Sequence, residues 1–256
     1  MMRSLLRIHL LELKCEFLKM FRLPAYVIPT LAFPLIFYLF FGVAFGTKSS
    51  IGATKMATYL IATYGAFGVI GASLFGFGVN VAVERGQGWL QVKRTTPMPV
   101  SAYFVAKISM AMIFSAAIVV ALMTLGVMLG GVHLSLAQAA SLFGVLIAGS
   151  LTFCALGLAI GYFAGPNSAP ALVNIIYLPM SFLSGLWVPI WAMPKPLQTL
   201  AFFLPPFHFS QLALRVIGAG RGMPASINVI ALVISTALFL VIAYVGFRRD
   251  KGKNYG

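Results

Sequence analysis

Acidic residues are almost missing from this chain. Its 256 residues include four Asp and Glu against 18 Lys and Arg, and charged residues of both signs make up only 9% of the sequence. Soluble domains carry about 25% charged residues, so this chain has too few to cover a water-exposed surface. With 61% hydrophobic residues and a mean hydropathy of +0.99, the sequence predicts an integral membrane protein.

Groups suited to catalysis or metal binding are equally scarce. The two cysteines, Cys15 and Cys154, are far apart and are interpreted as free thiols. The three histidines, His9, His133 and His208, have no acidic partner nearby in sequence and no metal-ligand spacing. The stretch GVAFGTKS at 42–49 lacks the spacing of a Walker A loop. We therefore expect no enzyme activity, metal or cofactor here, so that any ATP and Mg²⁺ would be bound by a partner.

Long uncharged runs predict an all-α protein with six transmembrane helices, since about 20 apolar residues cross a bilayer. Glycine and proline turn signals near 130–133 and 165–167 divide the longest run. Several prolines interrupt residues 192–224, for which we expect short re-entrant outer helices. The chain is thus one transmembrane domain, 1–256, with predicted spans at 24–46, 56–83, 105–130, 138–164, 168–190 and 226–247.

Residues 1–23 predict a helix lying in the membrane interface. The apolar positions Leu6, Leu10, Leu13, Phe17 and Met20 form one helical stripe, and Glu12, Glu16, Lys19 and Arg22 lie mostly away from it. Six spans put both termini on one side, and most Lys and Arg residues fall on that side. The positive-inside rule therefore predicts that both termini are cytosolic.

All four acidic residues, Glu12, Glu16, Glu84 and Asp250, fall at or beyond the predicted cytosolic boundary. We therefore expect no ionisable group buried within the spans. A transporter driven by protons or ions usually needs one there. Uphill transport by this chain would have to draw its energy from a partner protein.

The polar insert 84–96 joins the second and third predicted spans. It predicts a cytosolic helix of about three turns. Trp89, Leu90 and Val92 are apolar positions that water alone would not favour there. A short helix with an aromatic anchor can fill a groove on another protein, although a tryptophan in the headgroup belt accounts for the pattern equally well.

Two stretches resemble one transporter family. ERGQGWLQVKRTTPMP, at 84–99, resembles the segment after the second span of type-2 ABC exporter permeases. Trp89 and Gln91 depart from the family pattern. Residues 182–215 resemble the fifth span and outer helices of the same family, through Ser184-Gly185, Pro189, Met193-Pro194, Leu204-Pro205 and Arg215.

The resemblance implies that 84–96 is a coupling helix seated in a cytosolic ABC ATPase subunit. It further implies that two permease subunits, identical or different, join two ATPases in a bacterial-type cytoplasmic membrane. The lipid bilayer is then a further partner, and no nucleic-acid partner is expected. The residues implied in ATPase coupling are Glu84, Arg85, Gly88, Trp89, Leu90, Thr96 and Pro97.

The resemblance also implies a translocation path along spans 2 and 5. Polar candidates there are Asn80, Asn174, Tyr177 and Ser181, which hydrogen bonding between helices explains about equally well. We expect a permease that exports a hydrophobic or amphipathic compound, drug-like or lipid-like. Alternatives are a scaffold or sensor subunit that moves nothing, a membrane enzyme, and a lipid-linked polysaccharide exporter whose path would use Phe33, Phe37, Phe40, Phe41, Tyr59 and Tyr64.

Overall fold

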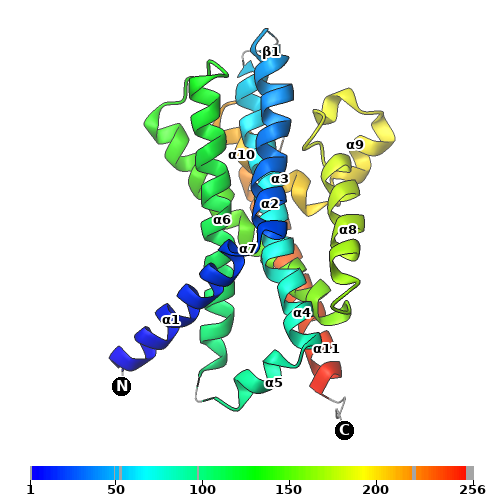
Figure 1. Cartoon of the computed structure of the whole chain (residues 1–256). Coiled ribbons are helices and arrows are strands. Elements are labelled where there is room, and N and C mark those ends of the chain that lie inside the picture. The colour runs from blue at the N-terminus through cyan, green and yellow to red at the C-terminus, as the bar shows by residue number, and fades with distance from the viewer. Residues whose placement is uncertain (1, 49, 52–53, 97, 221–222, 252–256) are drawn as a thin grey trace.

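The computed structural model describes residues 2–48, 50–51, 54–96, 98–220 and 223–251 as a bundle of tall helices (Figure 1). A short antiparallel hairpin of β1 and β2 closes the loop between the first two long helices. The elements in chain order are α1 Met2–Phe21, α2 Pro24–Phe37, η1 Tyr38–Ala44, η2 Gly46–Lys48, β1 Ser50–Ile51, β2 Thr54–Lys55, α3 Met56–Ser73, η3 Leu74–Val79, α4 Asn80–Gly86, α5 Trp89–Arg94, α6 Val100–Met128, α7 Leu136–Phe163, α8 Ala169–Leu183, η4 Ile190–Ala192, α9 Lys195–Ala201, α10 Pro205–Val216 and α11 Ala225–Lys251.

Within the described part of the chain, five continuous helical stretches are long and apolar enough to cross a membrane. They are Pro24–Ala44, Met56–Gly86, Val100–Met128, Leu136–Phe163 and Ala225–Asp250, and each overlaps a predicted span. This helical, apolar architecture agrees with an integral membrane protein.

The predicted span 168–190 is wrong in its extent. Its helix, α8, has 15 residues and ends at Leu183, where a turn follows with Gly185 at a φ of 78°. At 1.5 Å per residue α8 is about 22 Å long, shorter than the roughly 30 Å apolar core of a bilayer. The sequence did not predict this turn, because the run is uncharged throughout and serine and glycine both occur within membrane helices.

Helix α3 forms the centre of the bundle. Large side chains such as Ile61, Tyr64 and Phe67 are at most 1% exposed. By contrast, α2 and α11 leave large apolar side chains at the surface, including Ile28 and Val233. Apolar side chains that face outward all along a helix are expected where lipid, not water, surrounds the protein.

The second span changes from α-helix to π-helix at η3. Within η3 the chain comes very close to α7, because a Cβ built on Gly78 would lie 2.7 Å from the carbonyl oxygen of Gly157. Gly157 and Gly161 both contact this part of the same chain. These two glycines of α7 therefore let helices of the same subunit pack closely.

Gly78→Leu is expected to destabilise the protein by about 1–3 kcal/mol or more, since the new side chain would overlap backbone and not a movable side chain. Thermal denaturation of the purified protein measures the loss. Gly144→Leu is the control, because a Cβ on Gly144 has no neighbour within 4 Å. Equal melting midpoints for the two variants would contradict the close helix contact.

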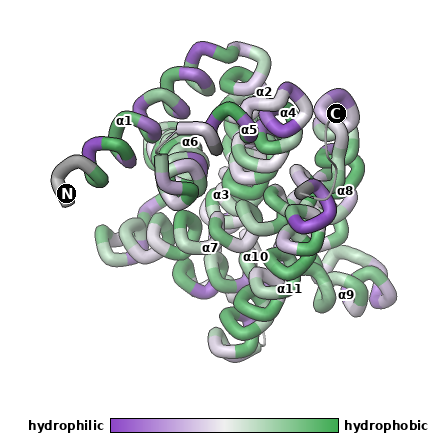
Figure 2. The backbone as a smooth tube through the Cα atoms, turned by 90° about the horizontal axis from the view of Figure 1, so that it is seen from below, coloured by the Kyte–Doolittle hydropathy of each residue, from purple (hydrophilic) through white to green (hydrophobic). Residues whose placement is uncertain are grey.

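The described residues of 192–224 include two short α-helices, α9 and α10. The start of α1 and the end of α11 lie at the opposite end of the bundle from the β1–β2 hairpin (Figure 1). Seen from that end, hydrophilic positions gather along α1, around α4 and α5 and near the C-terminus (Figure 2). We call this end, formed by α1, α5 and the last turns of α4 and α11, the polar end.

The predicted apolar stripe of α1 is exposed at its start and buried at its end. Leu6 and Leu10 are 63% and 57% exposed, while Glu16, which lies off the stripe, is 3% exposed. Met20, at the end of the predicted stripe, is fully buried. Helix α1 therefore turns acidic side chains toward α6 and leaves its leucines outward, which suits a helix lying against lipid.

Candidate functional site

The predicted coupling segment is not one helix. Glu84 and Arg85 complete the last turn of α4, Gly88 follows in a turn with a φ of 76°, and α5 begins at Trp89. A left-handed φ favours glycine, so Gly88 sets the angle at which α5 leaves the span. The site therefore divides into residues that hold this turn and residues that α5 presents outward.

Helix α5 has one inner and one outer face. Leu90 packs against a small apolar cluster that includes Phe77, Val81 and Tyr103. Trp89 and Val92 are 53% and 54% exposed. We call these two side chains the docking face, because exposed aromatic and apolar groups on a short helix can anchor a partner protein.

Glu84 lies inside the protein, contrary to the expectation that ionisable groups stay at the solvated boundary. It is 4% exposed and accepts hydrogen bonds from Tyr103 at 2.8 Å and from Lys107 at 3.0 Å. Lys19 forms a further ion pair with it. The expectation is wrong because a carboxylate can be buried where several donors compensate for its lost hydration.

Lys107 joins Glu84 to a second buried acid. Its side chain is fully buried, and its Nζ lies 2.8 Å from Glu16 as well as 3.0 Å from Glu84. Lys93 of α5 extends this network to α1, at 2.6 Å from Glu12 and 3.3 Å from Glu16. Three carboxylates and three ammonium groups thus form one cluster, which we call the ion-pair cluster.

Burial of Lys93 opposes its charged form, but its hydrogen bond to Glu12 and the charges of Glu16 and Glu84 prevail and raise its pKa. Because the pKa of Lys93 is raised on folding, the ion pairs of Lys93 contribute their full stability to the fold below the ordinary lysine pKa of about 10.4. This contribution is lost only as the pH rises through the folded-state pKa. At neutral pH, α5 is therefore held to α1 by charge.

Arg85 faces the C-terminal helix α11. Its guanidinium donates to Asp250 at 3.0 Å and to the carbonyl oxygen of Ala164 at 2.6 Å. Thr96 is exposed, and its hydroxyl donates to the carbonyl oxygen of Lys93 at 2.7 Å. Pro97 lies outside the described residues.

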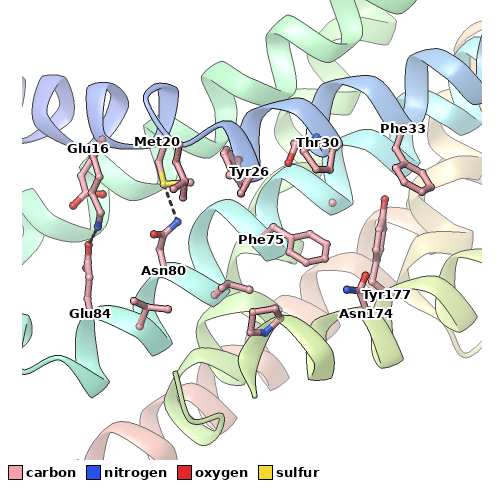
Figure 3. A pocket seen from close by; sticks show the side chains of 18 of the residues that line it. Glu16, Met20, Tyr26, Thr30, Phe33, Phe75, Asn80, Glu84, Asn174 and Tyr177 are labelled. Atoms are coloured by element: carbon pink, nitrogen blue, oxygen red, sulfur yellow. Dashed lines mark hydrogen bonds and ion pairs between the residues drawn. The ribbon is translucent and has the colours of Figure 1, made fainter. Parts of the chain in front are cut away.

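A groove of 1060 Å³ opens beside the ion-pair cluster. Side chains of α1 and α2 line one wall, those of α8 line the other, and α3, η3 and α4 form its floor (Figure 3). Its mouth is polar, with Glu16, Lys19 and Glu84, and Trp89 of the docking face also borders it. Aromatic side chains, including Tyr26, Phe33, Phe67 and Phe75, line it further along. The groove can hold a molecule with an apolar body and a polar end.

Residues 11–217 match the sequence model of the family described as ABC-2 type transporter. The chain belongs to the ABC-2 type transporter family.

Individual relatives agree with this membership. YvfS of Bacillus subtilis (strain 168), whose name describes it as a transport permease, is 26% identical over 89% of this chain and 92% of its own length. The inner membrane transport permease YhhJ of Escherichia coli (strain K12) is 29% identical over 66% of this chain. This chain spans about half of YhhJ, namely 46% of its length.

Three of the four predicted path residues of this ABC-2 permease line the groove. Asn80 donates to the carbonyl oxygen of Gly76 at 2.8 Å and contacts the sulfur of Met20. Tyr177 stacks on Phe67 and donates to its carbonyl oxygen at 2.8 Å. Asn174 is exposed in the groove and makes no side-chain hydrogen bond to any described residue.

Ser181, the fourth predicted path residue, is fully buried and does not border the groove. Of the aromatic set proposed for a sugar path, Phe33 borders the groove, whereas Phe40 and Phe41 are 60% and 49% exposed on the outer surface. The polar and aromatic side chains of the two spans therefore do not all serve one path.

Sequence reasoning missed the ion-pair cluster. Glu12 and Glu16 are one helical turn apart, so they share a face of α1, and this was visible in the sequence. In a chain with four acidic residues, two on one helical face indicate a buried or paired role. Lys107, inside a predicted span, was the corresponding signal on the other side of the contact.

Proposed function

We propose that this protein is the permease subunit of an ATP-driven exporter that moves a hydrophobic or amphipathic compound out of the cytosol. ATP and Mg²⁺ would be bound by a separate ABC ATPase subunit, the kind of partner that the ABC-2 family generally implies. The observation that carries the proposal is the junction of the docking face, the ion-pair cluster and the groove at one end of the bundle.

The orientation follows from charge. Basic residues of α1, α5 and the end of α11 gather at the polar end, and the positive-inside rule assigns such an end to the cytosol. Both termini would then be cytosolic in the cytoplasmic membrane. A cytosolic ATPase would meet Trp89 and Val92 there, while the groove rises from the same surface.

The lining of the groove supports an amphipathic cargo, drug-like or lipid-like. Aromatic rings can accept an apolar body, and the free amide of Asn174 offers one oriented polar contact. A polysaccharide exporter is less well supported, because the aromatic residues expected along its path are distributed over different faces. A scaffold that moves nothing would have no need for a groove of this size.

A second permease subunit fits beside the groove. Helix α2 borders the groove, and η1, which continues the same span, exposes Phe40 and Phe41, so an apolar surface continues outward along this span. We propose that another permease subunit covers part of this surface and completes the path. Whether the two are identical chains can be read from the composition of the purified complex.

Co-purification with the ABC ATPase encoded by a neighbouring gene tests the docking assignment. Trp89→Asp is expected to weaken the complex about thirtyfold or more, since loss of an aromatic hot spot costs about 2 kcal/mol or more. Gln91→Asp is the matched control: it adds the same charge to an exposed position of α5 and keeps the apolar anchor. Leu90 is avoided because it packs internally.

The melting midpoint of Trp89→Asp should match that of the unmodified protein, because Trp89 is half exposed. Retention of the ATPase at unmodified affinity by both variants would overturn the docking assignment. Transport by this chain alone, driven by a proton or sodium gradient, would overturn the exporter proposal itself.

A further inference from the structure

A second, smaller pocket lies far from the polar end. It has a volume of 570 Å³ and lies between the end of α10 and the first turns of α11. Helix α11 is long enough to cross a membrane, and its last turn pairs Asp250 with Arg85 at the polar end. The first turn of α11, and the pocket beside it, therefore lie near the opposite membrane surface.

The lining of this pocket is polar and positively charged. Gln211 and Asn228 are 7% and 2% exposed, and both contribute to the wall beside Arg215. Nε2 of His208 lies 2.9 Å from the carbonyl oxygen of Phe202, so Nδ1 of a neutral ring accepts from the side-chain amide of Asn228 at 2.9 Å and leaves the second N–H of that amide for a ligand. A buried amide N–H and a guanidinium are donors that suit an oxyanion.

The charge of Arg215 has no carboxylate partner from the side chains of this chain. All four Asp and Glu residues of the sequence are engaged in the ion pairs of the polar end. Nη1 of Arg215 reaches the carbonyl oxygen of Met223 at 3.4 Å, near the upper limit for a hydrogen bond. A cation in a pocket without an internal counter-ion favours an external anion.

The surface next to the pocket is apolar. Ile227 and Ile230, on either side of Asn228 in the first turns of α11, are 44% and 56% exposed. Helix α11 therefore turns its amide toward the pocket and its aliphatic side chains outward. A ligand with an anionic head and acyl chains could contact both surfaces at once, whereas free phosphate would use only the first.

We propose that this pocket binds the phosphate of an anionic phospholipid of the surrounding membrane. Arg215 contributes the charge, and Asn228 contributes a neutral donor. The N-terminus of α11 adds a favourable dipole at the same place. This assignment does not depend on the identity of the transported compound or on the ATPase.

Native mass spectrometry of the purified protein, which counts bound lipids individually, tests the proposal. The probes are phosphatidylglycerol, phosphatidylcholine and inorganic phosphate. The unmodified protein should retain a phosphatidylglycerol molecule that Arg215→Gln loses, with an affinity at least about tenfold lower. Lys195→Gln is the matched control, because Lys195 is an exposed cation of α9 that does not line the pocket.

Asn228→Asp keeps the size of the side chain and adds an internal carboxylate beside Arg215. It should also lose the bound phosphatidylglycerol. Equal lipid retention by Arg215→Gln and Lys195→Gln would overturn the proposal, as would equal binding of phosphatidylcholine. Binding of inorganic phosphate as tight as that of phosphatidylglycerol would also overturn it, since the pocket would then be a phosphate site without a lipid role.

Discussion

Replacing Lys107 by Met should unfold or severely destabilise this protein. The side chain is fully buried and contacts Glu16 and Glu84, so its loss leaves two buried carboxylates with fewer donors. Removing one partner of a buried ion pair costs about 3–5 kcal/mol. Methionine keeps the length and apolar stem of lysine, so the loss reports charge and not a cavity. The expected change is a melting midpoint lower by roughly 10 °C.

A second substitution separates charge from packing. Adding Glu16→Gln to Lys107→Met removes one of the stranded negative charges and should restore part of the lost stability. Lys14→Met is the control, since it removes an exposed lysine from α1. If Lys107→Met melts at the same temperature as Lys14→Met, the ion-pair cluster contributes nothing to stability.

The ion-pair cluster also shows where sequence reasoning stopped. Hydropathy located the long helices because each needs a continuous apolar run, and this pattern is local. The burial of Glu84 was not visible in that way. It depends on donors from α1 and α6, Lys19 and Lys107, which are distant from it in sequence.

The same distinction applies to the candidate site. Trp89 stood out as an aromatic residue in a polar insert, and it is exposed as a docking residue must be. Its neighbour Leu90 fits the family motif, from which Trp89 departs, but Leu90 packs inward. Adjacent residues of a helix point in different directions, so the direction in which α5 leaves Gly88 determines which of the two side chains is exposed. That direction depends on the φ of Gly88, which cannot be read from composition. Sequence therefore located the segment, while its inner and outer faces required the fold.

Filling the groove should stop transport without disturbing the complex. Thr30 of α2 borders the groove, and its side chain points into it among Tyr26 and Phe33 (Figure 3). Thr30→Trp places an indole where the cargo would lie. Overlap that costs about 1–3 kcal/mol lowers cargo affinity by about 5- to 150-fold. The measurement is ATP-dependent movement of a lipophilic dye and of a fluorescent phospholipid by the reconstituted permease and ATPase.

The design of this test depends on the two faces of α2. Ile28→Trp adds the same indole two residues away, on a side chain that is 63% exposed and outside the groove lining, so transport should persist. ATPase co-purification should be unchanged in both variants, because the docking face on α5 is untouched. Transport by Thr30→Trp at the rate of Ile28→Trp would mean that cargo does not pass through the groove. A loss confined to Thr30→Trp would place the cargo beside the same α3–α4 span that carries Glu84, so that α5, the ion-pair cluster and the path would form one connected unit.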